Sequence, residues 1–505
     1  MLKQAAYAHK LWRRWMRQEA GNVAIIFALA VVPIIGGVGA SVDISRAYVV
    51  KSRLNQALDA AGLAVGSLVG LSDAELTAKA QAFFKANYPA SKLGVTADIT
   101  VQQLDGVVVI EGTAKVQTVM VNFIGVPEVD VTASVEITRE SKGLEVVLVL
   151  DNTGSMSSNG KLNAMKDAAT EMVDILFGSE TNPEKLKVGL VPFSAGVNLG
   201  PDFIRSGYMD TAGISSTHGE NFTTGTNVWD LYDDLKNREW EGCVETRPEP
   251  YDETDAVPTS GNGDTLWVPW FAPDEPDHGD RRYYYSNNYL NDGFGRNSSA
   301  GMDERQRNVA KYKNKNVNSN SKGPSYGCNI PAVTALTNHR DIIEDGIDDL
   351  VASGYTHIPI GLAWGWRLLS PQAPFTEGVA YDDEENTKAI ILLTDGQNVL
   401  GTMNNHNGKR YTAYGFLPEK RLGTSNGGQA QQELDYKTAR LCENVKAEGI
   451  RVYTITFQLN DTTTQNLMRA CATNESLYFN SPSNEQLRLA FQTIAQDLSN
   501  LRISK

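Results

Sequence analysis

An uncharged, apolar run of 20 residues near the N-terminus constrains this chain more than any other feature. It extends from Val23 to Val42 and reads VAIIFALAVVPIIGGVGASV. A helix of about 20 apolar residues spans the hydrocarbon core of a bilayer. Membrane helices also tolerate proline and glycine better than soluble helices do. We therefore predict a transmembrane helix over residues 23–42.

The charges on either side of this run predict its orientation. Asp43 lies directly after it, and five basic residues precede it: Lys3, Lys10, Arg13, Arg14 and Arg17. By the positive-inside rule, residues 1–22 form a basic cytoplasmic tail. The chain is then a single-pass protein of the inner (cytoplasmic) membrane with a periplasmic or extracellular C-terminal domain. A cleaved signal peptide is the alternative. The helical pattern continues without a break after residue 43, which favours an uncleaved anchor.

Length and charge limit the possible roles of the remainder of the chain. A chain of 505 residues exceeds one ordinary core, so two or three domains are expected. The net charge of −14 argues against nucleic-acid binding, which needs a basic face.

Residues 43–140 are predicted to form a helical stalk and a small β-rich module. The strand pattern there is an alternation of Val, Ile and Thr with polar residues, as in VVVIEGTAKVQ.

From residue 143 onward, apolar strands alternate with amphipathic helices. This pattern predicts an α/β domain over residues 143–500, with a parallel sheet covered by helices on both faces, as in Rossmann-like folds. Two stretches, at about 199–331 and 401–428, interrupt this alternation of strands and helices. The first contains four of the eight tryptophans, and disordered linkers are poor in aromatics. We therefore predict that it is a large, at least partly folded insertion.

Oxygen-bearing side chains lie after the predicted strands at the point where ligands bind in open α/β sheets. Asp151, Thr153 and Ser155 come directly after the strand LEVVLVL, in the pattern Asp-x-Thr-x-Ser. Asp395 comes after the strand AIILLT, and Thr356 precedes a helix-like stretch. Two carboxylates and three hydroxyls without sulfur suit a hard cation. We predict a Mg²⁺ site, with Mn²⁺ and Ca²⁺ as alternatives.

Other interpretations of these residues remain open. Asp-x-Thr-x-Ser alone is also typical of a helix cap. A metal-assisted hydrolase could use the same carboxylates to activate water, although His357 is the one histidine close to them in sequence. The string Gly423-Thr-Ser-Asn-Gly427 matches GxSxG, but it lacks the preceding strand of a nucleophile elbow, so we interpret it as a turn. We predict a binding protein and not an enzyme. A rigid strut with an incidental metal is a further alternative.

The order Asp151-x-Thr153-x-Ser155, Thr356, Asp395 resembles the metal-ion-dependent adhesion site of von Willebrand factor A (VWA) domains. The resemblance covers residues 143–500 apart from the insertions. It implies that the hydroxyls contact the metal and that the aspartates do so directly or through water. It also implies a protein partner that offers a carboxylate to complete the coordination. Thr153 stands where serine is more usual, and it keeps the hydroxyl.

The N-terminal segment resembles a second family. Residues 17–66, with Gly21-Asn22, Pro33 and Val42-Asp43, are similar to TadE/TadG-like proteins of Flp (tight-adherence) pilus assembly. With a VWA-like domain behind it, the TadG-like kind is the nearest. The resemblance implies work in pilus assembly or cell adhesion, with pilus-assembly or surface components as partners. The apolar run lacks the glutamate of processed pilins, which puts pilin-type cleavage in doubt.

The four cysteines show no zinc-like spacing, and an even number in an exported domain suggests disulfides. Cys442 and Cys471 lie on predicted helices that flank one strand, so we pair them. Cys243 and Cys328 bracket most of the insertion and form the second predicted pair. Four buried free thiols are the alternative.

Overall fold

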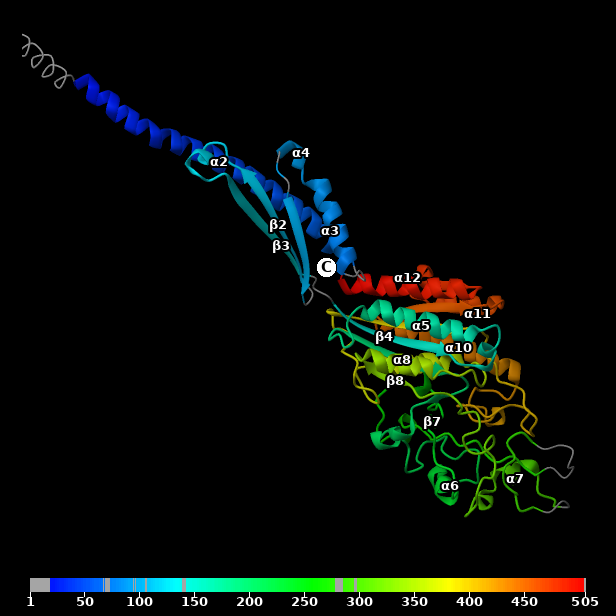
Figure 1. Cartoon of the computed structure of the whole chain (residues 1–505). Helices are drawn as coiled ribbons and strands as arrows, with labels where there is room; N and C mark the ends of the chain where they lie inside the picture. The colour runs from blue at the N-terminus through cyan, green and yellow to red at the C-terminus, as the bar shows by residue number, and fades with distance from the viewer. Residues whose placement is uncertain are drawn as a thin grey trace, which may run out of the picture. The chain divides into compact units, whose positions relative to one another are not determined.

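The computed structural model describes residues 19–66, 68, 73–93, 95, 97–104, 107–138, 142–277, 285–294 and 298–503. The basic residues from Lys3 to Arg17, on which the predicted orientation depends, lie outside these ranges. The chain divides into two compact units, Met1–Ser141 with Lys505, and Lys142–Ser504. Each is described by itself (Figure 1).

The first unit is a long helix with a three-stranded antiparallel sheet. Helix α2 (Glu19–Gly66) contains the whole apolar run, and among the described residues it is the one helix long and apolar enough to cross a membrane. Two shorter helices come next, α3 (Asp73–Asn87) and α4 (Ala90–Leu93). The sheet has the order β1-β2-β3, with β1 (Ala97–Leu104), β2 (Val107–Gln117) and β3 (Glu128–Thr138). The strand alternation seen in the sequence therefore forms as predicted.

The hairpin of β2 and β3 packs along α2 (Figure 1). Side chains of β2 alternate between buried and exposed, and the buried ones join Leu54 and Leu58 of the helix in one core. Glycines permit the close approach. A Cβ at Gly62 would lie 2.5 Å from Ile137, and one at Gly112 would lie 3.0 Å from Leu54. The stalk and the β-rich module are thus one packed structure.

The second unit contains a six-stranded sheet in the order β11-β10-β9-β4-β5-β8. Five strands are parallel: β4 (Gly143–Asp151), β5 (Leu186–Phe193), β9 (Asn386–Thr394), β10 (Arg451–Phe457) and β11 (Tyr478–Ser481). Edge strand β8 (Thr334–Thr337) is antiparallel, and this departs from the all-parallel prediction. The connection from β5 to β8 is the insertion and not a crossover helix, so nothing forces β8 to run parallel.

Helices cover both faces of this sheet, as predicted. Val147 and Val149 of β4 pack toward one face, and the alternate residues, among them Val146 and Leu148, pack toward the other. The first face carries α9 (Ile358–Leu369), α10 (Gly427–Ala447) and α11 (Thr462–Cys471). The second carries α5 (Lys161–Phe177), α8 (Arg340–Asp348) and α12 (Asn484–Ile503). Helix α10 begins at Gly427, where the side chain of Asn426 caps it.

The large insertion is packed although it has few regular elements. Among its described residues they are α6 (Val228–Asp234), β7 (Cys243–Val244) and α7 (Met302–Arg307), and β6 (Val197–Asn198) lies directly before it. Short 3-10 helices complete the second unit: η2 (Gly154–Ser157), η3 (Pro201–Ser206), η4 (Tyr251–Glu253), η5 (Gly263–Thr265), η6 (Val309–Lys311), η7 (Leu417–Glu419) and η8 (Glu475–Leu477). Trp267 and Trp270 are fully buried and belong to the same core as α9 and α10.

Both predicted disulfides are present. Cys243 bonds to Cys328 across 85 residues, and Cys442 of α10 bonds to Cys471 of α11 across 29 residues. These bonds account for all four cysteines of the chain. The alternative of four unpaired thiols is therefore wrong.

Candidate metal centre

The predicted site begins at the carboxyl end of β4. Asp151 is the last residue of this strand and is fully buried. Its Oδ1 accepts a hydrogen bond from the backbone N–H of Thr153 at 2.9 Å. Its Oδ2 accepts one from the hydroxyl of Thr394 at 2.7 Å. The carboxylate is thus held by the loop after β4 and by the last residue of the neighbouring strand β9.

Three hydroxyls gather beside this carboxylate. The Oγ1 of Thr153 lies 3.0 Å from the Oγ of Ser155 and 3.2 Å from the Oγ1 of Thr356. Mg²⁺ takes octahedral ligands at about 2.1 Å, so adjacent ligands lie about 3 Å apart. The separations of the Thr153 hydroxyl from those of Ser155 and Thr356 are hydrogen-bond distances, and they also fit neighbouring corners of such a coordination shell.

The second carboxylate closes the group. Asp395 comes directly after β9, and its Oδ1 accepts a hydrogen bond from the Oγ of Ser155 at 2.5 Å. Its Oδ2 pairs with the ammonium of Lys161 at 2.9 Å, and both side chains are almost fully buried. The structure thus brings together all five residues that the sequence pattern predicts: Asp151, Thr153, Ser155, Thr356 and Asp395.

Backbone hydrogen bonds explain why Thr356 joins a loop that lies about 200 residues earlier in the chain. Its Oγ1 reaches across a sequence separation of 203 residues to Thr153. The N–H of Ser353 donates to the carbonyl of Asn152 at 2.8 Å, and the N–H of Gly154 donates to the carbonyl of Gly354 at 3.1 Å. These two bonds fix the segment before α9 against the loop after β4.

A third loop is tied to the same segment. The N–H of Val399 donates to the carbonyl of Thr356 at 2.9 Å. Asn398 accepts the N–H of Ile358 at 2.8 Å, and its own amide donates to Asp435 of α10 at 2.8 Å. The site is therefore built from three loops at the carboxyl edge of the sheet. They meet at β4 and β9, where the strand order reverses, which is the usual ligand position in such folds.

The electrostatics of the site favour a cation. Burial and the neighbouring Asp395 carboxylate raise the pKa of Asp151 to about 7. Two negative charges in a site removed from water repel each other, and a divalent ion would relieve that repulsion. Lys161 offsets part of this charge through its ion pair with Asp395.

The donor set agrees with a hard ion that keeps water or a further ligand. Within the described residues, no group of three or more His, Cys, Asp and Glu side chains is placed to hold a metal. An ion at this edge of the sheet would therefore need the hydroxyls as ligands beside the two carboxylates. Asp151, Thr153, Thr356 and Asp395 are buried, whereas Ser155 is exposed. The site thus has one open side, through which an ion and a further ligand can enter.

His357 is the candidate general base for a hydrolase. It is the residue that precedes α9, and its ring is fully buried. Neither ring nitrogen has a hydrogen-bond partner among the described residues. Burial lowers the pKa of His357 to about 4, so the ring is neutral at pH 7. A side chain enclosed in this way is a packing residue beside the site.

Three residues outside the predicted set support the site: Lys161, Thr394 and Asn398. Thr394 directly precedes Asp395, and Asn398 lies three residues after it. Polar residues this close to a strand end indicate a site at the edge of the sheet, so the sequence could have identified both. Lys161 begins α5, ahead of an amphipathic helix pattern, and nothing in its sequence context indicates a partner as distant as Asp395.

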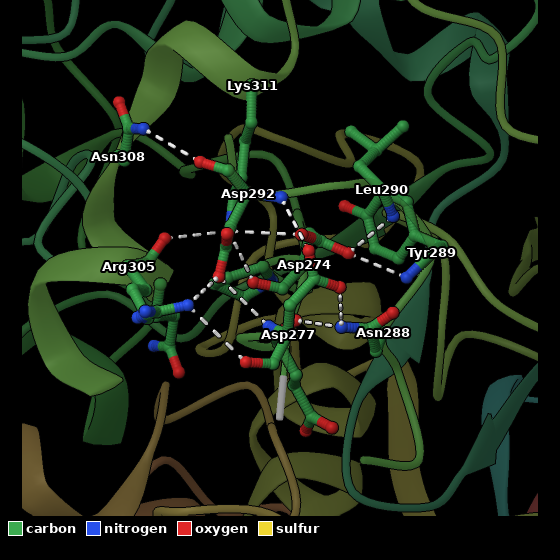
Figure 2. A network of polar contacts seen from close by, with 12 residues as sticks. Asp274, Asp277, Asn288, Tyr289, Leu290, Asp292, Arg305, Asn308 and Lys311 are labelled. Carbon is green, nitrogen blue, oxygen red and sulfur yellow. Dashed lines mark hydrogen bonds and ion pairs between the residues drawn. The ribbon is translucent and has the colours of Figure 1, made fainter. Parts of the chain in front are cut away.

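A second group of carboxylates lies in the insertion, and two of them pair with cations of the chain itself. Figure 2 shows that Lys311 pairs with Asp274 at 3.1 Å and Arg305 with Asp292 at 3.1 Å. Asp292 also accepts the backbone N–H of Asp277 at 3.0 Å. These contacts cross-link the insertion. At the sheet edge, by contrast, Lys161 pairs with Asp395, and Asp151 is held by hydrogen bonds from Thr153 and Thr394.

The strand order, the helices on both faces and the three loops that meet at the sheet edge define a VWA-like domain. Residues 21–69 match the family model described as "Putative Flp pilus-assembly TadE/G-like". This match confirms the N-terminal resemblance. The chain thus combines a TadE/G-like N-terminal segment with a VWA-like domain. No curated protein matches the sequence.

Several solved structures share part of the arrangement. The pilus adhesin SpaC from Lactobacillus rhamnosus GG is 13% identical, with 80% of this chain and 34% of that protein covered and a TM-score of 0.31. The vWF domain of the type V pili tip protein Mfa5 from Porphyromonas gingivalis is 12% identical, with 72% and 97% covered and a TM-score of 0.34. The pilus adhesin RrgA from Streptococcus pneumoniae is 12% identical, with 79% and 49% covered and a TM-score of 0.31. The fold assignment rests on the strand order and not on these low scores.

Proposed function

We propose that this chain is a membrane-anchored protein that acts in pilus assembly or cell adhesion through metal-ion-dependent protein–protein binding. The observation that carries the proposal is the convergence of five oxygen-bearing side chains from three loops at the strand-order reversal. The TadE/G-like match over residues 21–69 supports the pilus context.

Asp151, Thr153, Ser155, Thr356 and Asp395 would hold one Mg²⁺, with Mn²⁺ or Ca²⁺ as substitutes. The bound ion would supply an electrophilic centre for an anionic ligand. The buried residues keep their oxygens oriented, because each is fastened to a neighbouring loop. The exposed side at Ser155 leaves room for a carboxylate from a partner protein. Recognition of an acidic side chain is the chemistry that this arrangement supports best.

A metal-assisted hydrolase remains the second candidate, since two carboxylates beside a metal can activate water. Such a reaction also needs a general base that can reach the bound water. His357 is enclosed, and Lys161 pairs with Asp395. The contacts around the site therefore favour binding over hydrolysis.

The proposed function can be tested by complementation of a bacterial strain that lacks the gene. Wild-type protein is expected to restore surface pili and adherence, counted by electron microscopy and by retention of cells on a surface. Asp395→Ala should restore neither, since it removes a carboxylate ligand and the partner of Lys161. Asp382→Ala is the matched control, because Asp382 is exposed and lies outside the site. Full restoration by Asp395→Ala would refute the proposal.

The proposed anchor has its own test. Residues 23–42 would cross the inner membrane with the N-terminus in the cytoplasm, and the two disulfides support an oxidising compartment for the second unit. Alkaline phosphatase fused after Lys505 is expected to be active in intact cells. A cytoplasmic reporter fused at the same position should be inactive. The opposite pattern would show that the second unit lies in the cytoplasm.

A further inference from the structure

The turn between β2 and β3 exposes apolar side chains and carries no charge. Residues 118–127 read TVMVNFIGVP. Val119, Met120 and Val126 have 53%, 44% and 42% of their surface exposed. Apolar surface gathered at the end of a hairpin is unfavourable in water and marks a place where something binds.

This turn is fastened to α2 at the end of the apolar run. The carboxylate of Asp43 accepts three successive backbone N–H groups of the turn at 2.8–3.0 Å, those of Val119, Met120 and Val121. Met120 also packs against the helix at Gly39, where a Cβ would lie 2.5 Å from the Cβ of Met120. The turn therefore lies beside the last helical turn of the 23–42 run (Figure 1).

The charge-free parts of the helix and the hairpin end at the same level. On the hairpin, the first charged side chains on either side of the turn are Lys115 and Glu128, which pair at 3.4 Å. On the helix, Asp43 is the first charged residue after the run, and Arg46 is the next. The guanidinium of Arg46 donates to the carbonyl of Gln117 at 3.4 Å. One polar boundary thus crosses both elements.

We propose that the β2–β3 turn is a second membrane-contacting element, which enters the interfacial layer of the bilayer beside α2. The inference rests on the proposed anchor, because residues 23–42 place the turn at the membrane surface. Lipid is the occupant that the contacts favour. The turn contacts α2 at Gly39, and the apolar side chains of α2 before that point are exposed, as expected of surface that a bilayer would cover. The turn sets the depth at which α2 enters the membrane, since Asp43 and Gly39 fix the two together.

The test places a fluorescent probe at three exposed positions of the full chain, one at a time. All four native cysteines are in disulfides, so a single introduced cysteine can carry the probe. Val126→Cys reports on the turn, Leu29→Cys on the apolar run, and Glu111→Cys on the middle of β2. Each labelled protein is reconstituted in vesicles of phosphatidylethanolamine and phosphatidylglycerol that carry a nitroxide quencher near the headgroup or near the chain end.

The probe at residue 126 is expected to emit at shorter wavelength than the probe at residue 111 and to lose most of its fluorescence to the headgroup-proximal quencher. The probe at residue 29 should be quenched by the nitroxide near the end of the lipid acyl chain. Quenching at residue 29 without quenching at residue 126 would overturn the inference and leave the anchor intact. Absence of quenching at residue 29 would overturn both. The emission of the probe at residue 126 could also move to shorter wavelength only when the protein-to-lipid ratio rises. That result would mean that the turn binds a second copy of the chain, and it would overturn the lipid proposal.

Discussion

Replacement of Asp151 by alanine is expected to abolish Mg²⁺ binding while leaving the fold in place. The carboxylate lies at the end of β4 and supplies one of the two negative charges that would neutralise a divalent ion. Loss of a carboxylate that holds the ion directly or through water should lower the metal affinity by about 100-fold or more, since loss of a residue outside the coordination shell already costs about 10- to 100-fold. Thr153 and Thr394 would each lose one hydrogen-bond acceptor, but the β4 pairing with β5 and β9 remains.

Isothermal titration with Mg²⁺ and Mn²⁺ on the full chain in detergent measures this effect. A thermal melt provides a second readout, because an ion present at 100 times its Kd stabilises the native state by about 2.7 kcal/mol. Wild type and the surface variant Asp382→Ala should show both signals, and Asp151→Ala should show neither. Asp151→Asn is a useful companion, because it keeps the size of the side chain and removes the charge. Equal affinity in wild type and Asp151→Ala would exclude the site.

The pH dependence of the same titration depends on the raised pKa of Asp151. Burial and the Asp395 carboxylate hold this pKa at about 7 in the metal-free protein. The protonated carboxyl group is a poor ligand, so protons compete with the ion. Metal affinity is therefore expected to fall as the pH drops below about 7, and to change little above it.

Much of this site can be predicted from the sequence, because its position depends on strand ends. Asp151 directly follows an apolar run, and Asp395 follows another after the single polar residue Thr394; such runs indicate central strands of a parallel sheet. Carboxyl ends of parallel strands share one edge, so the sequence pattern places both aspartates at that edge, and the VWA resemblance joins them in one site. The structure adds that β4 and β9 are neighbouring strands. Thr356 is harder to place, because the insertion separates it from β5, and the hydrogen bonds of Ser353 and Gly154 fix its position.

Contacts between distant segments lie beyond this kind of reasoning. The pairing of Lys161 with Asp395 depends on where α5 begins relative to the loop after β9, which no local pattern encodes. The antiparallel direction of β8 depends on how the insertion returns to the sheet edge. In the sequence, residues 118–127 show only a break between two strand patterns. The attachment of this turn to Asp43 joins positions more than 70 residues apart and is visible only in three dimensions.

Removal of the Cys243–Cys328 disulfide is expected to cause the largest loss of stability among the substitutions considered. The bond closes a segment with a sequence separation of 85 residues, and the chain-entropy model assigns about 4.5 kcal/mol to a loop of that length. The separation of 29 residues between Cys442 and Cys471 gives about 3.6 kcal/mol in the same model. The insertion has few regular elements that could hold it together without its disulfide. In contrast, α10 and α11 pack on a sheet, which still holds them when their disulfide is removed.

The comparison of Cys243→Ala/Cys328→Ala with Cys442→Ala/Cys471→Ala separates these effects. Urea unfolding should give the lower free energy of unfolding for the first variant. In limited proteolysis followed by mass spectrometry, the first cleavage of this variant should fall within residues 199–331. Trp240 and Trp270 both donate hydrogen bonds to the carbonyl of Cys243, and without the disulfide this carbonyl is no longer held in place. The second variant should resist cleavage there. Similar cleavage of the insertion in wild type and the first variant would mean that its buried tryptophans and ion pairs, and not the disulfide, hold it together.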